Sequence, residues 1–241
     1  MEISKKEYLI SLLFPKHCPF CGHPMEIYQM YCEECEQELP WVPSDSLCPT
    51  CGKKNCICSN DPFLKRLYVP FFYDGLVANA IKNLKFYNKR AYSRPLRSLL
   101  AHYIRQKDQN SHFDCIIPIP MTKRDIRKRG YSQSELMARF TGEELNIPVE
   151  KNRLIKVHQT EKQHRLNAEE RRINLKDAFA VKDPETLKGK SVLLCDDVIT
   201  TGATLLEAAK TLRDAGITDI SAVVVATTEE LENHSENVYN K

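Results

Sequence analysis

The chain has 241 residues, which at roughly 150 residues per domain corresponds to one medium domain and one small one. A hydrophobic fraction of 42% and a charged fraction of 28% exclude a disordered, fibrous or low-complexity chain. The net charge of +3 is unevenly distributed: residues 1–60 carry −3, residues 61–228 carry +9 and residues 229–241 carry −3. We therefore expect a small domain over 1–60, a larger one over 61–228 and an acidic, flexible tail over 229–241.

Eight of the ten cysteines lie in the first 60 residues, mostly as CxxC pairs. The two sets are Cys18, Cys21, Cys32 and Cys35, followed by Cys48, Cys51, Cys56 and Cys58. Each CxxC pair directs two sulfurs at one point, and two pairs complete the tetrahedral shell that zinc prefers. The sequence thus predicts structural zinc, with two ions as the expected number. The second set ends in CxC, so sequential and cross-braced pairings both stay open, and redox CxxC pairs, inert thiols and iron–sulfur ligation are the alternatives.

No window of the sequence approaches the roughly 20 apolar residues that a membrane-spanning helix needs. We therefore expect no membrane insertion. The sequence also lacks a convincing export signal, and the reducing cytoplasm favours metal-bound thiolates over disulfides. A cytoplasmic protein is the resulting expectation.

Residues 113–118, 191–195 and 220–226 form short apolar runs, which are typical of parallel strands buried on both faces. Helical patterns separate them. Residues 132–135 read as a capping box, and Leu205, Ala208, Ala209 and Leu212 mark one face of a later helix. This alternation predicts an α/β fold with a doubly wound parallel sheet and ligands at the carboxyl ends of its strands.

The most informative segment covers residues 192–204. A buried strand leads to Asp196 and Asp197, and then to a small, hydroxyl-rich turn and a helix. The turn consists of Thr200, Thr201, Gly202, Ala203 and Thr204. Hydroxyls, backbone amides and a helix N-terminus bind phosphate, while paired acids accept hydrogen bonds from sugar hydroxyls or help to hold Mg²⁺. A phosphorylated ribose is therefore the predicted ligand, and a plain helix cap is the alternative. A Walker B strand with a P-loop is excluded, because Pro184 stands where a P-loop needs glycine.

This segment resembles the signature of type I phosphoribosyltransferases, which bind phosphoribosyl pyrophosphate (PRPP) together with magnesium. The resemblance implies that Asp196 and Asp197 contact the ribose hydroxyls and that residues 200–204 surround the 5-phosphate. Enzymes that salvage 6-oxopurines have an aspartate where this chain has Thr200. Hypoxanthine and guanine are therefore disfavoured as acceptors.

The resemblance extends along the chain to the ComF family of competence-associated proteins, and to its ComFC-type members in particular. It is carried by the cysteine sets, by residues 71–75, 85–86, 118–120 and 129–133, and by Gln163 with residues 170–175. It implies a zinc-ribbon domain before a phosphoribosyltransferase domain, PRPP binding and a role in the uptake of single-stranded DNA. Single-stranded DNA and a DNA-uptake helicase are the implied macromolecular partners.

Three basic runs receive expected roles. The acid-free stretch 75–107 carries eight Lys or Arg with interleaved aromatics, which favours contact with single-stranded DNA through Lys82, Lys85, Lys89 and Arg90. A solvated basic helix is the alternative. By resemblance, Lys123 and Arg124 belong to the pyrophosphate loop, and Lys162 and Gln163 to the flap that closes over PRPP.

No residue in the sequence stands out as a nucleophile or general base, so the acceptor is undetermined. Three functions stay open: a ComF-type DNA-uptake protein that binds PRPP, a metabolic phosphoribosyltransferase, and a non-catalytic PRPP sensor whose zinc ribbons bind a partner. If the protein is an enzyme, its reaction is the displacement of pyrophosphate from PRPP.

Overall fold

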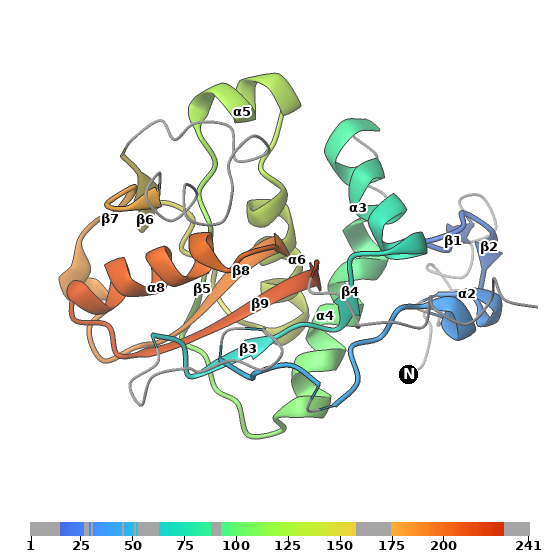
Figure 1. Ribbon diagram of the computed structural model, residues 1–241, viewed down its shortest axis with the longest axis horizontal. Helices are drawn as coiled ribbons and strands as arrows, with labels where there is room; N and C mark the ends of the chain where they lie inside the picture. The colour runs from blue at the N-terminus through green and yellow to red at the C-terminus, as the bar shows by residue number, and fades with distance from the viewer. Residues whose placement is uncertain are drawn as a thin grey trace, which may run out of the picture.

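The structure, a computed structural model, describes residues 15–26, 29, 31–44, 46–50, 52, 63–87, 93–157 and 175–228 (Figure 1). Within these ranges, the side chains of residues 16, 83–87, 93–98, 123, 128 and 129 are not described. A parallel sheet lies at the centre of the molecule, and a small cysteine-containing module lies at one end.

The central sheet contains β3 (Arg66–Tyr68), β4 (Phe71–Phe72), β5 (Cys115–Pro118), β8 (Ser191–Ile199) and β9 (Asp219–Thr227). Its order is β3-β9-β8-β5, with β4 also paired to β9, and every pairing is parallel. β8 and β9 are the long inner strands, and their central parts, residues 192–195 and 222–226, are apolar and buried, as expected for strands covered on both faces. Because all strands run the same way, the sheet has one edge of strand starts and one of strand ends, which we call the amino edge and the carboxyl edge.

Helices cover both faces of this sheet (Figure 1). α4 (Ser93–Lys107) and α6 (Gln133–Leu145) pack on one face, and α8 (Ala203–Asp214) packs on the other. Leu205, Ala208, Ala209 and Leu212 of α8 are buried, as the periodicity predicted. The doubly wound parallel sheet expected from the sequence is therefore confirmed.

The remaining elements of the larger module connect the strands and helices of the central sheet. α3 (Gly75–Tyr87) follows β4, and α5 (Lys123–Arg129) follows β5. A small antiparallel hairpin consists of β6 (Leu154–Lys156) and β7 (Phe179–Val181), and the one-turn helix η3 (Pro184–Thr186) leads from it toward β8. Residues 158–174, which include the expected flap residues Lys162 and Gln163, lie outside the described residues.

Two side-chain caps set the start of the helices that follow β5. Thr122 Oγ1 accepts a hydrogen bond from the backbone N–H of Asp125 (3.1 Å) at the start of α5. Ser132 Oγ accepts from the backbone N–H of Glu135 (3.2 Å) at the start of α6. The second contact confirms the predicted helix start, because a capping hydroxyl satisfies an N–H group that the helix leaves unpaired.

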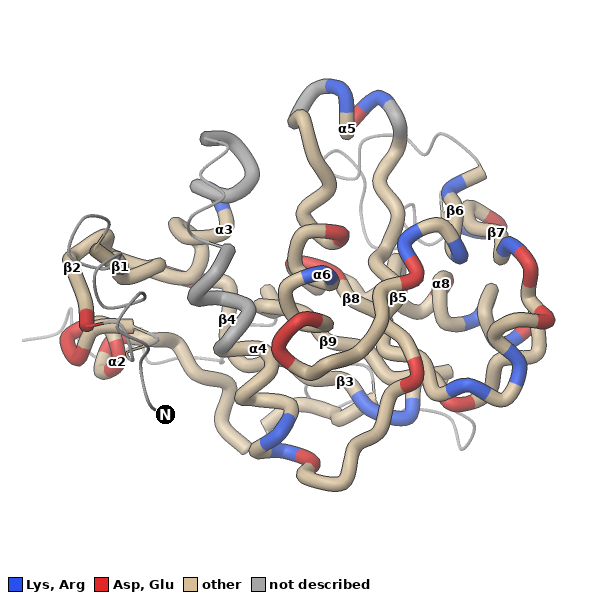
Figure 2. Tube along the Cα trace, turned by 180° about the vertical axis from the view of Figure 1, so that it is seen from behind, with Lys and Arg blue, Asp and Glu red and all other residues tan. Residues whose placement is uncertain are grey.

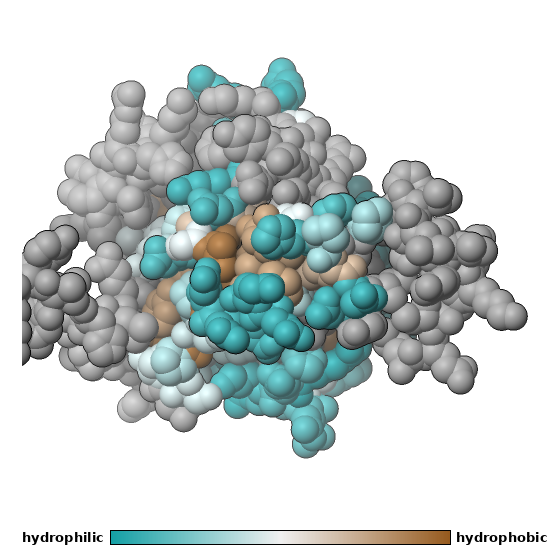
Figure 3. All heavy atoms as spheres, turned by 90° about the vertical axis from the view of Figure 1, so that its right-hand side faces the viewer, coloured by the Kyte–Doolittle hydropathy of each residue, from teal (hydrophilic) through white to brown (hydrophobic). Residues whose placement is uncertain are grey.

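The cysteine module contains β1 (Lys16–His17), β2 (Pro24–Met25) and α2 (Glu33–Glu38). Cys18, Phe20 and Cys35 belong to the same buried cluster as Phe71 of β4 and Ile81 of α3. The module therefore packs directly on the larger one. Figure 3 shows hydrophobic surface gathered at the centre of the side that carries α2 and α3, with hydrophilic residues around it.

The chain after α2 joins the sheet at β4. Trp41 forms an antiparallel bridge with Phe71, the Val42 N–H donates to the Pro70 carbonyl (2.8 Å), and the Phe72 N–H donates to the Pro40 carbonyl (2.8 Å). This pairing covers a strand edge whose N–H and C=O groups would otherwise be open to other chains. Of the helices that the structure describes, none combines the length and hydrophobicity that a bilayer-spanning segment requires.

Candidate functional site

Asp196 and Asp197 lie within β8, which continues to Ile199 and does not end at Cys195 as the sequence indicated. The pairing of β5 with β8 ends where Pro118 lies opposite Cys195, and the Ile119 N–H donates to the Cys195 carbonyl (2.9 Å). β9 continues alongside as far as Ile199, opposite Thr227. Beyond Cys195, the described residues place a strand beside β8 only on the β9 side, so the acid pair lies at the carboxyl edge despite belonging to the strand.

Apolar residues before and after the acid pair anchor β8 in the two cores. Leu193, Cys195 and Val198 contribute to the core beneath α4 and α6, whereas Leu194 and Ile199 contribute to the core beneath α8. The pairing with β9 keeps one register here, from Asp196 opposite Val224 to Ile199 opposite Thr227. The acid pair is therefore held within a continuous, anchored strand.

Neutral donors hold both carboxylates. Asp196 Oδ1 accepts hydrogen bonds from Ser134 Oγ (2.7 Å) and from the Asp197 backbone N–H (2.9 Å). Asp197 Oδ1 accepts from the Val198 N–H (2.7 Å). Hydroxyl and amide donors orient a carboxylate without cancelling its charge. An acid pair held in this way suits vicinal hydroxyl groups or a hard cation.

The turn after β8 presents backbone N–H groups at the start of α8. Gly202 has φ 75° and ψ −7°, a left-handed conformation that glycine adopts without steric penalty. Thr201 Oγ1 accepts from the Ala203 N–H (3.4 Å), and α8 then runs for 12 residues. A turn of hydroxyls and amides before a helix N-terminus is suited to a phosphate group.

The expected pyrophosphate cations lie on a helix and not in a loop. Lys123 and Arg124 form the first turn of α5, and residues 119–122 alone make the connection from β5. The Arg124 side chain is exposed, and the Lys123 side chain is not described. Figure 2 shows basic positions on α5 and acidic positions on α2, in separate parts of the molecule.

Two residues near the acid pair were not among the expected site residues, although the basic run assigned to the flap begins at Lys156. Ser134 contacts Asp196 directly. Lys156, the last residue of β6, is half-buried with its Nζ 6.0 Å from the centre of the Phe179 ring. Burial lowers the pKa of Lys156, while Asp125 and Asp196 counteract that effect in part, so its pKa lies below the ordinary lysine value. In the sequence, the position of Lys156 at the start of the basic run indicated that it could lie near the ligand. No feature of the sequence indicated the same for Ser134.

The residues expected to contact DNA are only partly described. Lys82 is exposed on α3, while the Lys85 side chain and residues Lys89 and Arg90 lie outside the described part. Two other bases of the acid-free stretch make internal contacts. Arg105 Nη2 donates to the Glu144 carbonyl (2.6 Å), and Lys107 Nζ donates to Ser44 Oγ (2.8 Å). The stretch is therefore not a uniform row of cations available to a ligand.

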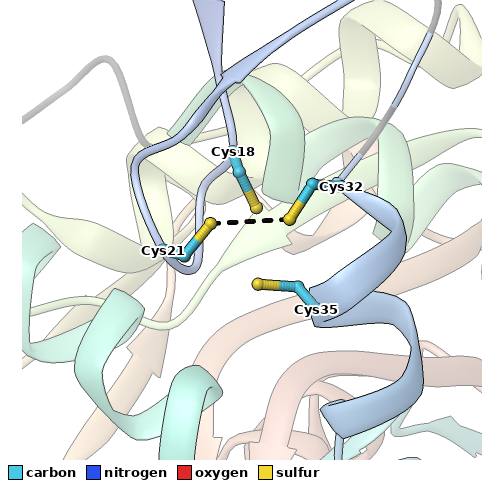
Figure 4. A group of neighbouring side chains, drawn as sticks. All are labelled: Cys18, Cys21, Cys32 and Cys35. Carbon is cyan, nitrogen blue, oxygen red and sulfur yellow. Dashed lines mark hydrogen bonds between the residues drawn. The ribbon is translucent and has the colours of Figure 1, made fainter.

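Cys18, Cys21, Cys32 and Cys35 form a four-sulfur cluster (Figure 4). Their Sγ atoms all lie within 4.8 Å of one another, and those of Cys21 and Cys32 are 3.5 Å apart. Tetrahedral zinc with Zn–S bonds of about 2.3 Å requires sulfurs about 3.8 Å apart. The four side chains point toward a common centre, so the cluster has the arrangement that a zinc ion requires.

The protein environment acts unevenly on these four thiols. Burial raises the pKa of Cys32 to about 11 and raises that of Cys35 further. Burial also tends to raise the pKa of Cys18, but hydrogen bonds from the backbone of Cys21, Cys32 and Phe20 outweigh it and lower that pKa. A divalent cation would compensate the charge of four close thiolates.

Cys48 begins a turn with the same backbone pattern as the Cys18 turn. The Gly22 N–H donates to the Cys18 carbonyl (3.0 Å), and the Gly52 N–H donates to the Cys48 carbonyl (2.9 Å). Both glycines have positive φ, 80° and 72°. The Thr50 N–H also contacts Cys48 Sγ (3.4 Å), an orientation typical of a metal-bound thiolate. Cys51, Cys56 and Cys58 lie outside the described residues.

The fold and the two sites define a phosphoribosyltransferase-fold protein with a zinc-ribbon module. The family model of the phosphoribosyl transferase domain matches residues 126–240, and that of the double zinc ribbon domain matches residues 9–66. Adenine phosphoribosyltransferase from Trypanosoma brucei is a distant structural match, with a TM-score of 0.39 and 16% identity over 64% of this chain and 73% of that one. The assignment of the fold therefore depends on the family models and the strand order.

Relatives of known name match nearly the whole chain. Competence protein F of Haemophilus influenzae is 31% identical over 209 residues, which cover 85% of this chain and 83% of that protein. DNA utilization protein YhgH of Escherichia coli O157:H7 is 28% identical, covering 83% and 92%. Competence protein ComFC of Bacillus subtilis is 26% identical, covering 83% and 72%. The chain belongs to the family of competence protein F, as its motifs indicated.

Proposed function

We propose that this protein binds PRPP at the carboxyl edge of its sheet and acts in competence, in the uptake or use of DNA. The observation that carries the PRPP assignment is the acid pair Asp196–Asp197, held by neutral donors and followed by the turn 200–204. The role in competence is supported by the names of the relatives, two of which are competence proteins and one a DNA utilization protein.

In this proposal, the ligand spans three elements of the carboxyl edge. The turn before α8 binds the 5-phosphate, Asp196 and Asp197 accept from the ribose hydroxyls, and Arg124 of α5 faces the pyrophosphate. Lys156 adds a cation within electrostatic range of Asp196. The acid pair and the pyrophosphate oxygens are the groups that would hold Mg²⁺, which supplies positive charge to the leaving group.

Calorimetry with PRPP, with and without magnesium, tests this site. We expect magnesium-dependent binding by the native chain and none by the variant Asp196→Asn plus Asp197→Asn. Absence of heat with the native chain, or equal affinity of the variant, would contradict the proposal. A screen for pyrophosphate release with ammonia, nucleobases and nucleic acid then distinguishes an enzyme from a PRPP sensor.

We also propose a second zinc ion bound through Cys48, because its turn repeats the hydrogen bonds of the Cys18 turn. Protein purified without chelators should contain two zinc ions per chain. Cys48→Ser should reduce the content to one, while Cys115→Ser, which changes a buried core thiol, should leave it at two. One zinc ion in the native chain would show that the second turn holds no metal.

A further inference from the structure

Ser134 connects α6 to the acid pair. It is the second residue of α6, its side chain is 4% exposed, and its Oγ lies 2.7 Å from Asp196 Oδ1. In sequence the two residues are 62 positions apart. A buried hydroxyl at this distance from a carboxylate forms a short, charge-assisted hydrogen bond with it. It is therefore a contact that fixes the position of the carboxylate.

The contact is separate from the capping of α6. Ser132 already caps the helix by accepting from the Glu135 N–H. Ser134 lies two residues further along the helix, and its hydroxyl donates to Asp196 of β8 and not to a group of α6. The N-terminus of α6, a helix of 13 residues, carries partial positive charge close to the Asp196 carboxylate. The Asp196 carboxylate therefore lies near a helix N-terminus, where negative charge is favourable.

Two donors meet at a single oxygen of Asp196. Ser134 Oγ and the Asp197 N–H both donate to Oδ1, at 2.7 and 2.9 Å, from α6 and from β8 itself. Two donors from different elements determine the orientation of the carboxylate plane. The contact from Ser134 therefore restrains rotation of the Asp196 side chain in addition to the Asp197 N–H.

Ser134 also lies on the same continuous segment as the cations of α5. From Arg124 the chain passes through α5, turns at Gly130, and enters α6 after Ser132. The helix that faces the pyrophosphate in the proposed site is therefore followed directly by the helix start that holds the ribose acid. A shift of this segment would move both groups together.

We propose that Ser134 is a positioning residue that orients Asp196 toward the ribose of the ligand and links it to the segment carrying Arg124. The inference rests on the proposed PRPP site. Ser134 acts through Asp196 and does not itself contact the ligand.

The test compares Ser134→Ala with Ser132→Ala. The second variant removes a hydroxyl from the start of the same helix, two residues before Ser134. Calorimetry in magnesium uses three ligands: PRPP, ribose 5-phosphate and inorganic pyrophosphate. We expect Ser134→Ala to weaken the binding of PRPP and of ribose 5-phosphate about tenfold, which is the effect of one hydrogen bond to a charged group. The affinity for pyrophosphate should change less than twofold. Ser132→Ala should lower the melting temperature but leave all three affinities within twofold.

Ser134→Thr, which retains the hydroxyl, should restore most of the PRPP affinity lost in the alanine variant. Equal losses in the two alanine variants, or an equal loss for pyrophosphate and ribose 5-phosphate, would show that Ser134 only stabilises the helix. Crystal structures of native protein and of Ser134→Ala give a readout without ligand: the Asp196 carboxylate should rotate in the variant. An unchanged Asp196 would overturn the inference even if the native chain bound no PRPP, a result that by itself refutes only the proposed function.

Discussion

The charged side chains at the two edges of the central sheet make different contacts. At the amino edge, acids pair with cations: Lys65 with Asp219 at 3.2 Å and Arg66 with Asp108 at 3.1 Å. At the carboxyl edge, Asp196 and Asp197 accept from a hydroxyl and from backbone amides. Charge pairs between exposed side chains thus mark the amino edge, whereas hydroxyl and amide donors orient the two acids of the carboxyl edge.

The amino edge also holds a shallow pocket of about 320 Å³, lined by residues that include Lys65, Arg66 and Asp219. Its ion pairs are solvent-exposed and contribute little to stability. Paired charges therefore line this pocket. The proposed function places the ligand at the carboxyl edge instead, because the residue types there suit phosphate and ribose.

The largest difference between the edges should appear in acid-to-amide pairs of variants. Asp196→Asn plus Asp197→Asn should weaken PRPP binding at least 100-fold, because two hydrogen bonds to charged acceptors contribute about 3 kcal/mol or more together. Asp108→Asn plus Asp219→Asn at the amino edge should change the affinity for PRPP less than twofold. Calorimetry measures both, and comparable losses would remove the distinction between the edges.

A smaller effect is expected from two glycines with the same left-handed backbone. Gly202 at the carboxyl edge and Gly189 before β8 have φ 75° and 72°. Alanine at either position should reduce the free energy of unfolding by about 1–2 kcal/mol, because side chains disfavour this conformation. Only Gly202→Ala should also weaken binding of PRPP and ribose 5-phosphate, by about tenfold, because the turn that contains Gly202 binds the 5-phosphate in the proposed site. Denaturant unfolding and calorimetry separate the two effects.

The smallest effect concerns nucleic acid. Lys82 on α3 and Lys65 at the amino edge are both exposed cations. If α3 contacts single-stranded DNA, Lys82→Ala should reduce the salt dependence of binding by about 0.7 in the slope of log K against log salt, as expected for one lost phosphate contact. Lys65→Ala should leave the slope unchanged. Fluorescence anisotropy of a labelled oligonucleotide measures it, and identical slopes in both variants would place the DNA elsewhere.

The sequence predicted three strands of the central sheet, but not β3 or β4. Buried apolar runs gave β5, β8 and β9, and the alternation with helices gave the doubly wound class, because local periodicity reflects burial directly. The sequence did not predict the extension of β8 to Ile199. That extension depends on β9, which pairs as far as Thr227, and pairing partners are not visible in one segment alone.

The contacts around the acids were predictable only in part. The residue types at 196–204 indicated phosphate and ribose chemistry, since that pattern is local. Ser134 was not predicted as a contact because it is an ordinary helix residue until the fold brings α6 to β8. The basic stretch 75–107 predicted positive charge, but Arg105 and Lys107 make internal contacts that composition does not reveal.

Trp41 is the single tryptophan of the chain, and it lies where the zinc-ribbon module joins the sheet. Its ring centre is 4.5 Å from that of Phe71, and its side chain is 37% exposed. The indole therefore works as a built-in optical reporter. Its emission should shift to longer wavelength when the ribbon separates from β4, so that docking of the two modules can be followed in solution without a label.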